Sequence, residues 1–191
     1  MKIGFCITGS FCTFGTIFPI LADFAVAGED LQVIFSENAY NLDTRFGQAA
    51  DWASRAQIIT NKDVWHTIAQ VEPIGPAGLF DLLIVAPCTG NTLAKIAGGI
   101  TDTCIAMAVK AQLRNEKPVL IGLSTNDALS GSAQNLGKLL NRRNIYFVPM
   151  GQDDPQNKPS SLVADFSLTL KAARAAASGL QLQPLLGGNP P

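Results

Sequence analysis

Short apolar runs alternate with stretches of helical spacing along the whole chain. The apolar runs predict strands over residues 2–8, 31–36, 82–86, 117–124 and 145–149. Successive apolar positions are typical of strands covered on both faces in a parallel sheet. The stretches between them predict helices over residues 13–27, 44–57, 62–70, 91–97, 102–112, 133–143 and 162–178. This alternation predicts a single-domain α/β protein with a doubly wound, Rossmann-like parallel sheet and right-handed crossovers.

Proline and glycine positions refine these boundaries. Pro19 lies inside the first predicted helix, so that helix either starts late, with Pro19 in its first turn, or bends there. Pro87 is expected to stop the strand over residues 82–86. We expect one domain over residues 1–180 and a tail over residues 181–191 that is ordered only against a neighbouring chain.

Composition narrows the class of protein. Only 15% of residues are charged, against about 25% in an average domain, which favours surface hidden in an oligomer. The 14 basic and 15 acidic residues are well mixed, without the basic stripe of a nucleic-acid-binding protein. No apolar segment reaches the ~20 residues of a membrane helix, and there is no signal-peptide pattern. We therefore expect a soluble, cytoplasmic protein with neither nucleic acid nor membrane as partner.

Cysteine and histidine usage predicts no metal site. Cys6, Cys12, Cys88 and Cys104 form no CxxC pair, and a single histidine, His66, does not complete a zinc set at this spacing. We expect reduced, mostly buried thiols. His66 is expected to be a surface or hydrogen-bonded histidine in a helix.

Small hydroxyl and amide residues follow the first four predicted strands, and neither lysine nor arginine does. Ligands bind outside the carboxyl ends of the strands in an open parallel sheet. Hydroxyls and backbone N–H groups at helix starts suit a phosphate, and amides suit a heterocycle. The segment "GSFCTFGT" fits neither a P-loop nor a dinucleotide fingerprint. A mononucleotide such as FMN fits better, and the alternative is that these hydroxyls are ordinary helix caps. The residues predicted to bind the cofactor are Thr8, Gly9, Ser10, Ser36, Pro87, Thr89, Asn91, Thr92, Ser124 and Asn126.

Two of these segments carry a family resemblance. "ITGS" together with "APCTGNTLAKIAGGITD" resembles the flavoprotein family of FMN-dependent cysteine decarboxylases and flavin prenyltransferases, whose loop typically reads P-A-S-A-N-T followed by A-K-x-A. The matching positions are Pro87, Asn91, Thr92, Ala94, Lys95 and Ala97, while Cys88, Thr89 and Gly90 differ. The resemblance implies a flavin at this loop. The decarboxylases also use a catalytic histidine and a P-x-M-N segment that this chain lacks, so cysteine decarboxylation is disfavoured and no catalytic residue is assigned.

A further resemblance covers nearly the whole chain, from residue 3 to about residue 184. "LDTRFG" (42–47), "KPVLIGLSTNDAL" (117–129), "NIYFVPMGQDDPQNKP" (144–159) and the terminal "LQP" resemble the B subunits of dipicolinate synthase. It implies an oxidoreductase subunit that works with an A subunit, which carries the NAD(P) site, to oxidise dihydrodipicolinate to dipicolinate during bacterial sporulation. It also implies trimers or larger assemblies. The alternatives are a stand-alone flavin-dependent decarboxylase or prenyltransferase, and a non-catalytic scaffold for the A subunit.

Individual side chains extend this hypothesis. Arg45 and Asn126 are candidates for binding the dicarboxylate substrate, because a guanidinium matches a carboxylate bidentately and an amide matches a ring edge. A surface arginine is an equally good interpretation of Arg45. Lys95 is expected on a solvated helix face, Asp102 as a helix N-cap, and Cys88 as a wall of the ligand pocket.

Overall fold

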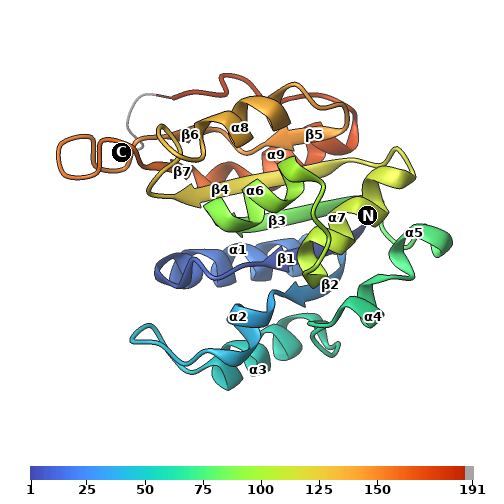
Figure 1. The fold of residues 1–191 in the computed structure, drawn as a ribbon. Helices are drawn as coiled ribbons and strands as arrows, with labels where there is room; N and C mark the ends of the chain where they lie inside the picture. The colour runs from blue at the N-terminus through green and yellow to red at the C-terminus, as the bar shows by residue number, and fades with distance from the viewer. Residues whose placement is uncertain (188–191) are drawn as a thin grey trace.

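The computed structural model describes residues 1–187 and contains a seven-stranded sheet between two layers of helices (Figure 1). The strands are β1 (Lys2–Ile7), β2 (Asp30–Phe35), β3 (Leu82–Cys88), β4 (Val119–Thr125), β5 (Ile145–Phe147), β6 (Met150–Gly151) and β7 (Leu162–Ala164). The helices are α1 (Phe14–Val26), α2 (Glu37–Asn41), α3 (Ala49–Thr60), α4 (Ile68–Val71), α5 (Ile74–Ala77), α6 (Gly90–Gly98), α7 (Cys104–Arg114), α8 (Ala133–Leu140) and α9 (Thr169–Ala177), with 3-10 turns at Phe11–Thr13 and Phe166–Leu168.

The strand order is β2-β1-β3-β4-β7-β6, with β5 paired to β4 beside this path. The pairings among β1 to β5 are parallel, whereas β7 runs antiparallel to both β4 and β6. The prediction of a single-domain, doubly wound α/β fold is confirmed. The prediction of a helix starting at residue 162 is wrong. Leu162 and Ala164 are buried and Val163 is half-buried, a strand alternation too short to be recognised against the alanine-rich helix that follows.

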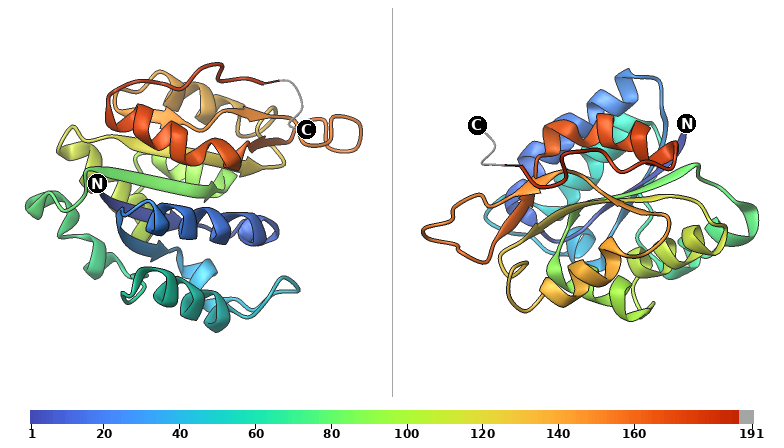
Figure 2. Two further views of the ribbon diagram at one scale, coloured as in Figure 1. Left: turned by 180° about the vertical axis from the view of Figure 1, so that it is seen from behind. Right: turned by 90° about the horizontal axis from the view of Figure 1, so that it is seen from above.

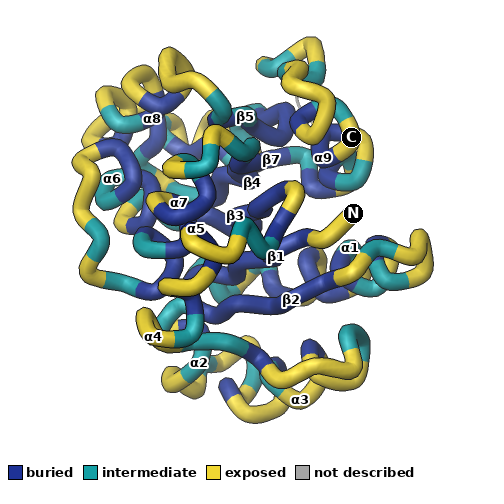
Figure 3. The backbone as a smooth tube through the Cα atoms, turned by 90° about the vertical axis from the view of Figure 1, so that its right-hand side faces the viewer, coloured by how far each residue is buried: buried dark blue, intermediate teal, exposed yellow. Residues whose placement is uncertain are grey.

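Two hydrophobic cores lie on opposite faces of the sheet. Helices α6, α7 and α8, with α4 and α5, cover one face, and α1, α3 and α9 cover the other (Figure 2). Every residue of β3 is buried, as expected for a central strand between two helical layers (Figure 3). The continuous apolar runs in the sequence are therefore the physical consequence of burial on both faces.

The region between β2 and β3 departs most from the predicted helices. The helix predicted from residue 44 begins at Ala49, after a turn that pairs Thr44 with Gly47. Most of the helix predicted over 62–70 is extended instead, because Trp65 pairs with Ile34 of β2. A capping box between Thr67 and Gln70 starts the short helix α4 only afterwards.

The two prolines have different outcomes. Helix α1 begins at Phe14, one residue from the predicted start, and contains Pro19 in its interior, so of the two alternatives for this helix the late start is excluded. Strand β3 continues through Pro87 to Cys88, so Pro87 does not stop it. The ladder between β3 and β4 shifts register between Val85 and Cys88. Such an irregularity accommodates a residue that has no N–H to donate.

The segment after α9 packs back onto the body of the protein. The Gln181 side chain donates to the Phe147 carbonyl at 2.7 Å and accepts from the Phe147 N–H at 2.8 Å. The Leu185 carbonyl accepts from Met150 N–H, and Gly187 N–H donates to the Met150 carbonyl. Residues 181–187 are thus ordered against their own chain, contrary to expectation, and residues 188–191 of the predicted tail lie outside the described residues. Over residues 1–187, no helix has the length and apolarity needed to cross a bilayer.

Candidate functional site: a cleft at the strand ends

A cleft of about 440 Å³ opens beyond the carboxyl ends of β1, β2 and β3. We call it the strand-end cleft. Its lining residues are Gly9, Ser36, Glu37, Asn38, Thr89, Asn91, Thr92, Lys95, Asp102, Thr103 and Ile105. Five of the residues predicted to bind the cofactor are among them: Gly9, Ser36, Thr89, Asn91 and Thr92. The volume falls in the range of small-molecule sites, about 300–1,000 Å³.

Helices α2, α6 and α7 begin at this cleft, and a hydroxyl caps each of them. Ser36 Oγ accepts from Ala39 N–H, Thr89 Oγ1 from Thr92 N–H, and Thr103 Oγ1 from Ala106 N–H, each at 3.3 Å. For Ser36 and Thr89, the interpretation of the strand-end hydroxyls as helix caps is therefore correct, whereas the Ser10 side chain caps no helix. Capping does not compete with an anion site, because the first turn of a helix has N–H groups without intrahelical partners and carries the positive end of its dipole.

The N-terminus of α7 already has an anionic partner. Glu37 Oε1 accepts from Cys104 N–H at 3.1 Å, and Cys104 Sγ donates to the Phe35 carbonyl at 3.0 Å. Burial, with the Glu37 charge as a second cause, raises the pKa of Cys104 to about 12. Cys104 is therefore a neutral thiol near pH 7. Of the two longer helices that begin at the cleft within residues 1–187, α7 donates a first-turn N–H to a carboxylate and α6 does not, although the Asp127 carboxylate lies beside the start of α6.

Thr8 fixes the loop after β3. Its hydroxyl donates to the Pro87 carbonyl at 2.7 Å and accepts from Thr89 N–H at 3.1 Å. Thr8 is buried, and neither Thr8 nor Pro87 lines the strand-end cleft. The sequence predicts both residues to bind the cofactor, and the contacts give them a second role in holding Thr89 at the start of α6.

Three further predicted residues are not among those that line the cleft. Ser10 Oγ and Ser124 Oγ form a hydrogen bond of 2.9 Å between the ends of β1 and β4. Asn126 is exposed just beyond β4. The Ser10–Ser124 hydrogen bond thus joins the end of β4 to the residue that follows Gly9 of the cleft lining.

Gly90 allows α6 to start in direct contact with a half-buried carboxylate. Asp127 accepts from Thr125 Oγ1 at 2.6 Å and from Ser132 Oγ at 2.9 Å. A Cβ on Gly90 would come within 2.7 Å of Thr125 Oγ1 and 2.8 Å of Asp127 Oδ1. Glycine is the residue that fits here, which gives a physical reason for its replacing the alanine of the family loop.

The structure places Lys95 and Asp102 differently from the sequence-based predictions. The sequence places Lys95 on a solvated helix face, but it lines the strand-end cleft, where its Nζ lies 2.6 and 2.7 Å from the two Asp102 oxygens. Asp102 is expected to cap α7, a role that Thr103 performs instead. The hydrogen bond from Lys95 lowers the pKa of Asp102. Sequence reasoning misses both as site residues, although Lys95 stands in the family motif.

Three residues singled out by sequence lie elsewhere. Arg45 is on the exposed loop between α2 and α3, with its guanidinium 4.8 Å above the Phe46 ring, and is not among the cleft-lining residues. His66 stacks on Tyr40, with ring centroids 3.6 Å apart, and lies before α4 rather than in a helix. Cys88 is fully buried, and burial raises its pKa to about 12, so the expectation of a pocket wall is wrong.

Comparison with known proteins agrees with this geometry. A model of the Flavoprotein family matches residues 1–165, and the chain belongs to that family. The dipicolinate synthase B subunit of Bacillus subtilis (strain 168) is 39% identical over 188 residues, covering 98% of this chain and 94% of that protein. The crystal structure of the dipicolinate synthase B subunit from Bacillus halodurans C superposes with a TM-score of 0.90 at 38% identity, covering 98% and 96% of the two chains.

A more distant structure shares the fold alone. The FMN-dependent cysteine decarboxylase SpaF superposes with a TM-score of 0.68 at 18% identity, covering 93% of this chain and 97% of that one.

Proposed function

We propose that this protein is the B subunit of a two-subunit dipicolinate synthase and that the strand-end cleft binds FMN. The likeness to the dipicolinate synthase B subunits of two Bacillus species carries this proposal, because it extends over 98% of this chain in both cases. With its A subunit, the enzyme would oxidise dihydrodipicolinate to dipicolinate during sporulation, in the cytoplasm.

The chemistry of the cleft supports a flavin phosphate. Ser36, Thr89 and Thr92 supply hydroxyls, Gly9 leaves backbone accessible, and α6 directs its N-terminus to the same space. Asn91 is exposed on the first turn of α6 and lines the cleft. Its side-chain amide can either donate a hydrogen bond to the flavin or accept one from it. FMN supplies the ability to take up and return an electron pair, which an oxidation of this type requires.

The substrate and the second cofactor are assigned separately. Dihydrodipicolinate carries two carboxylates and a ring, and we assign Arg45 to a carboxylate and Asn126 to the ring edge because both side chains are exposed on the segments that follow β2 and β4. The NAD(P) site is assigned to the A subunit, since the first strand of this chain is followed by no dinucleotide fingerprint. The low charged fraction supports a homo-oligomer, a trimer or larger, which light scattering would test.

Two measurements test the proposal. Apo-protein is titrated with FMN and followed by flavin fluorescence, and dihydrodipicolinate oxidation is then assayed with this chain, with its partner, and with the two together. We expect saturable FMN binding and turnover only with the two together. Turnover of a decarboxylase or prenyltransferase substrate by this chain alone would favour the stand-alone enzyme. If the partner were fully active without this chain, and this chain bound no FMN, the result would favour a non-catalytic scaffold role for this chain.

A further inference from the structure

Acidic side chains outnumber basic ones among the residues that line the strand-end cleft. Among the described residues that line it, Lys95 is the one cation, while Glu37 and Asp102 are both acids. Glu37 is engaged by Cys104 N–H at the start of α7. Asp102 contacts the Lys95 ammonium group with both carboxylate oxygens. A phosphate dianion entering the cleft would therefore meet a net negative lining, offset only by the helix N-termini.

The two members of the Lys95–Asp102 pair differ in exposure. The Asp102 side chain is 60% exposed, whereas that of Lys95 is 21% exposed. The Asp102 carboxylate can turn into water at little desolvation cost, while Lys95 stays against the cleft. Asp102 also lies in the short connection between α6 and α7, just after Gly98 and Gly99, where a Cβ on Gly99 would meet nothing within 4 Å.

We propose that Lys95 is the cation that holds the ligand's phosphate in the strand-end cleft, and that Asp102 occupies this position until the phosphate displaces it. The inference rests on the proposed function, because it names the residue that recognises the anionic end of the proposed cofactor. Asp102 then acts as an internal competitor. Its carboxylate keeps Lys95 oriented in the empty cleft and leaves when a doubly charged oxyanion offers the ammonium a stronger partner.

A purely structural ion pair between α6 and the start of α7 predicts something different. If the pair only joined the two helices, removing either member would disturb the cleft in the same direction. If Asp102 competes with the ligand, removing Lys95 and removing Asp102 have opposite effects on affinity. The sign of the Asp102 variant therefore separates the two interpretations.

The experiment measures the binding of inorganic phosphate and of FMN to the full chain by calorimetry, for wild type, Lys95→Gln and Asp102→Asn. We expect Lys95→Gln to weaken binding of both probes by roughly tenfold or more, since a charge-assisted contact is lost. We expect Asp102→Asn to tighten it by roughly three- to tenfold, because the competing charge is gone. Raising the salt concentration should reduce the wild-type affinity and have less effect on Lys95→Gln.

Lys110→Gln is the matched control, since Lys110 is exposed on α7 and does not line the cleft. It should bind both probes like wild type. Weaker binding in both Lys95→Gln and Asp102→Asn, together with lower melting temperatures, would overturn the inference in favour of a structural pair. Unchanged binding in Lys95→Gln would overturn it as well. A wild-type protein that binds neither probe would instead reject the proposed function itself.

Discussion

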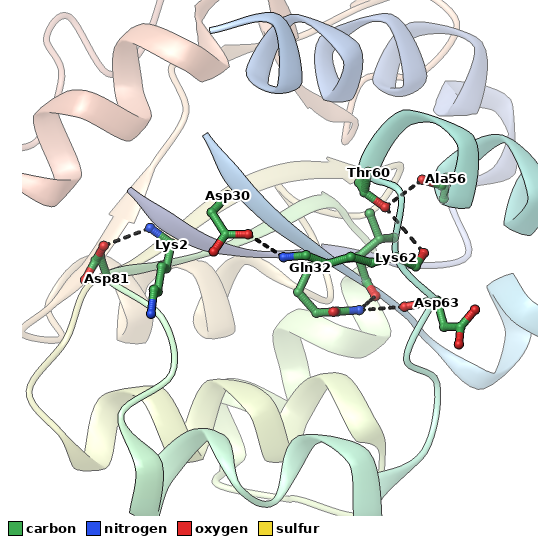
Figure 4. A network of polar contacts seen from close by, with 9 residues as sticks. Lys2, Asp30, Gln32, Ala56, Thr60, Lys62, Asp63 and Asp81 are labelled. Atoms are coloured by element: carbon green, nitrogen blue, oxygen red, sulfur yellow. Dashed lines mark hydrogen bonds and ion pairs between the residues drawn. The ribbon is translucent and has the colours of Figure 1, made fainter. Parts of the chain in front are cut away.

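The two ends of the sheet use polar side chains in opposite ways. At the amino ends of β1 and β2, polar groups bind one another: Lys62 pairs with Asp30, Gln32 donates to the Asp63 carbonyl at 2.7 Å, and Lys2 N–H donates to Asp81 at 2.8 Å (Figure 4). At the carboxyl ends, hydroxyls cap helices and line the strand-end cleft.

This contrast between the two ends indicates where a ligand can bind. Exposed ion pairs at the amino end join neighbouring segments and contribute little each. At the carboxyl end, by contrast, helices α2, α6 and α7 begin at the strand-end cleft, and the first turn of α6 is left for a ligand. The polar side chains at the amino end of the sheet therefore stabilise the fold, whereas those at the carboxyl end are available to bind a ligand. The following predictions test that contrast, beginning with the largest expected effect.

Gly90→Ala should produce the largest loss at the carboxyl end. Its Cβ would collide with Thr125 and Asp127, and overpacking of this kind costs about 1–3 kcal/mol of unfolding free energy. We expect FMN binding to fall as well, because the start of α6 must shift. Urea denaturation and flavin titration measure the two effects. Gly98→Ala in the same helix is the control, since its Cβ would meet Ile100 only at 3.6 Å, and equal losses in both variants would contradict the prediction.

Arg45→Ala tests whether the ligand-binding region extends to the loop after α2. If Arg45 forms a bidentate pair with a substrate carboxylate, losing about 1.5–3 kcal/mol should raise the KM for dihydrodipicolinate roughly ten- to a hundredfold in the two-subunit enzyme. Arg45→Lys keeps the charge but loses the fork, so it should recover part of the effect. Should both variants match wild type, Arg45 is a surface residue stacked on Phe46 and nothing more.

Asn91→Leu should weaken FMN binding in the cleft without unfolding the protein. Asn91 is exposed on the first turn of α6, so its removal leaves the core intact. We expect FMN affinity to fall roughly tenfold, from a lost hydrogen bond and an apolar group placed beside the phosphate. Flavin titration together with a thermal melt gives the answer. A variant that binds FMN like wild type would remove Asn91 from the site.

Lys62→Ala at the amino end should have the smallest effect. The Lys62–Asp30 pair is exposed on both sides, so we expect a loss below about 1 kcal/mol and unchanged FMN binding. Lys62 lowers the pKa of Asp30, so the pair's contribution is present above the unfolded pKa of about 3.9 and disappears as the pH falls through the lower folded value. Stability measured at pH 7 and at about pH 2.5 should therefore differ less in Lys62→Ala than in wild type.

The main strands can be predicted because burial on both faces leaves an unmistakable apolar run. The apolar run that begins at Phe80 indicates β3 for this reason. The small polar residues that follow it, up to Thr92, indicate where the strand ends. The short elements cannot be predicted in this way. Strands β6 and β7 contain two and three residues, and α2 contains five, so each is set by tertiary pairing rather than by a period in the sequence.

The hydroxyl-bearing residues of the candidate site can be predicted from the sequence, but its charged residues cannot. Ser36, Thr89 and Thr92 follow strands directly, and strand ends meet at one edge of a parallel sheet. Lys95 and Asp102 lie seven residues apart, and whether Asp102 reaches Lys95 at the cleft depends on the connection between α6 and α7. Arg45 follows β2 closely in sequence, yet the turn from Thr44 to Gly47 holds it on an exposed loop.

The strand-end cleft is lined by segments spread between residue 9 and residue 105, and Glu37 joins α2 to α7 across 67 residues of chain. No local piece of the protein can therefore assemble it, and an unfolded chain should have no affinity for FMN. By mass action, FMN bound in the proposed site would then stabilise the whole fold: at a free concentration of about 100 times its Kd, it would add about 2.7 kcal/mol to the free energy of unfolding. On this proposal, a cell's flavin supply would affect the stability of this protein as well as its activity.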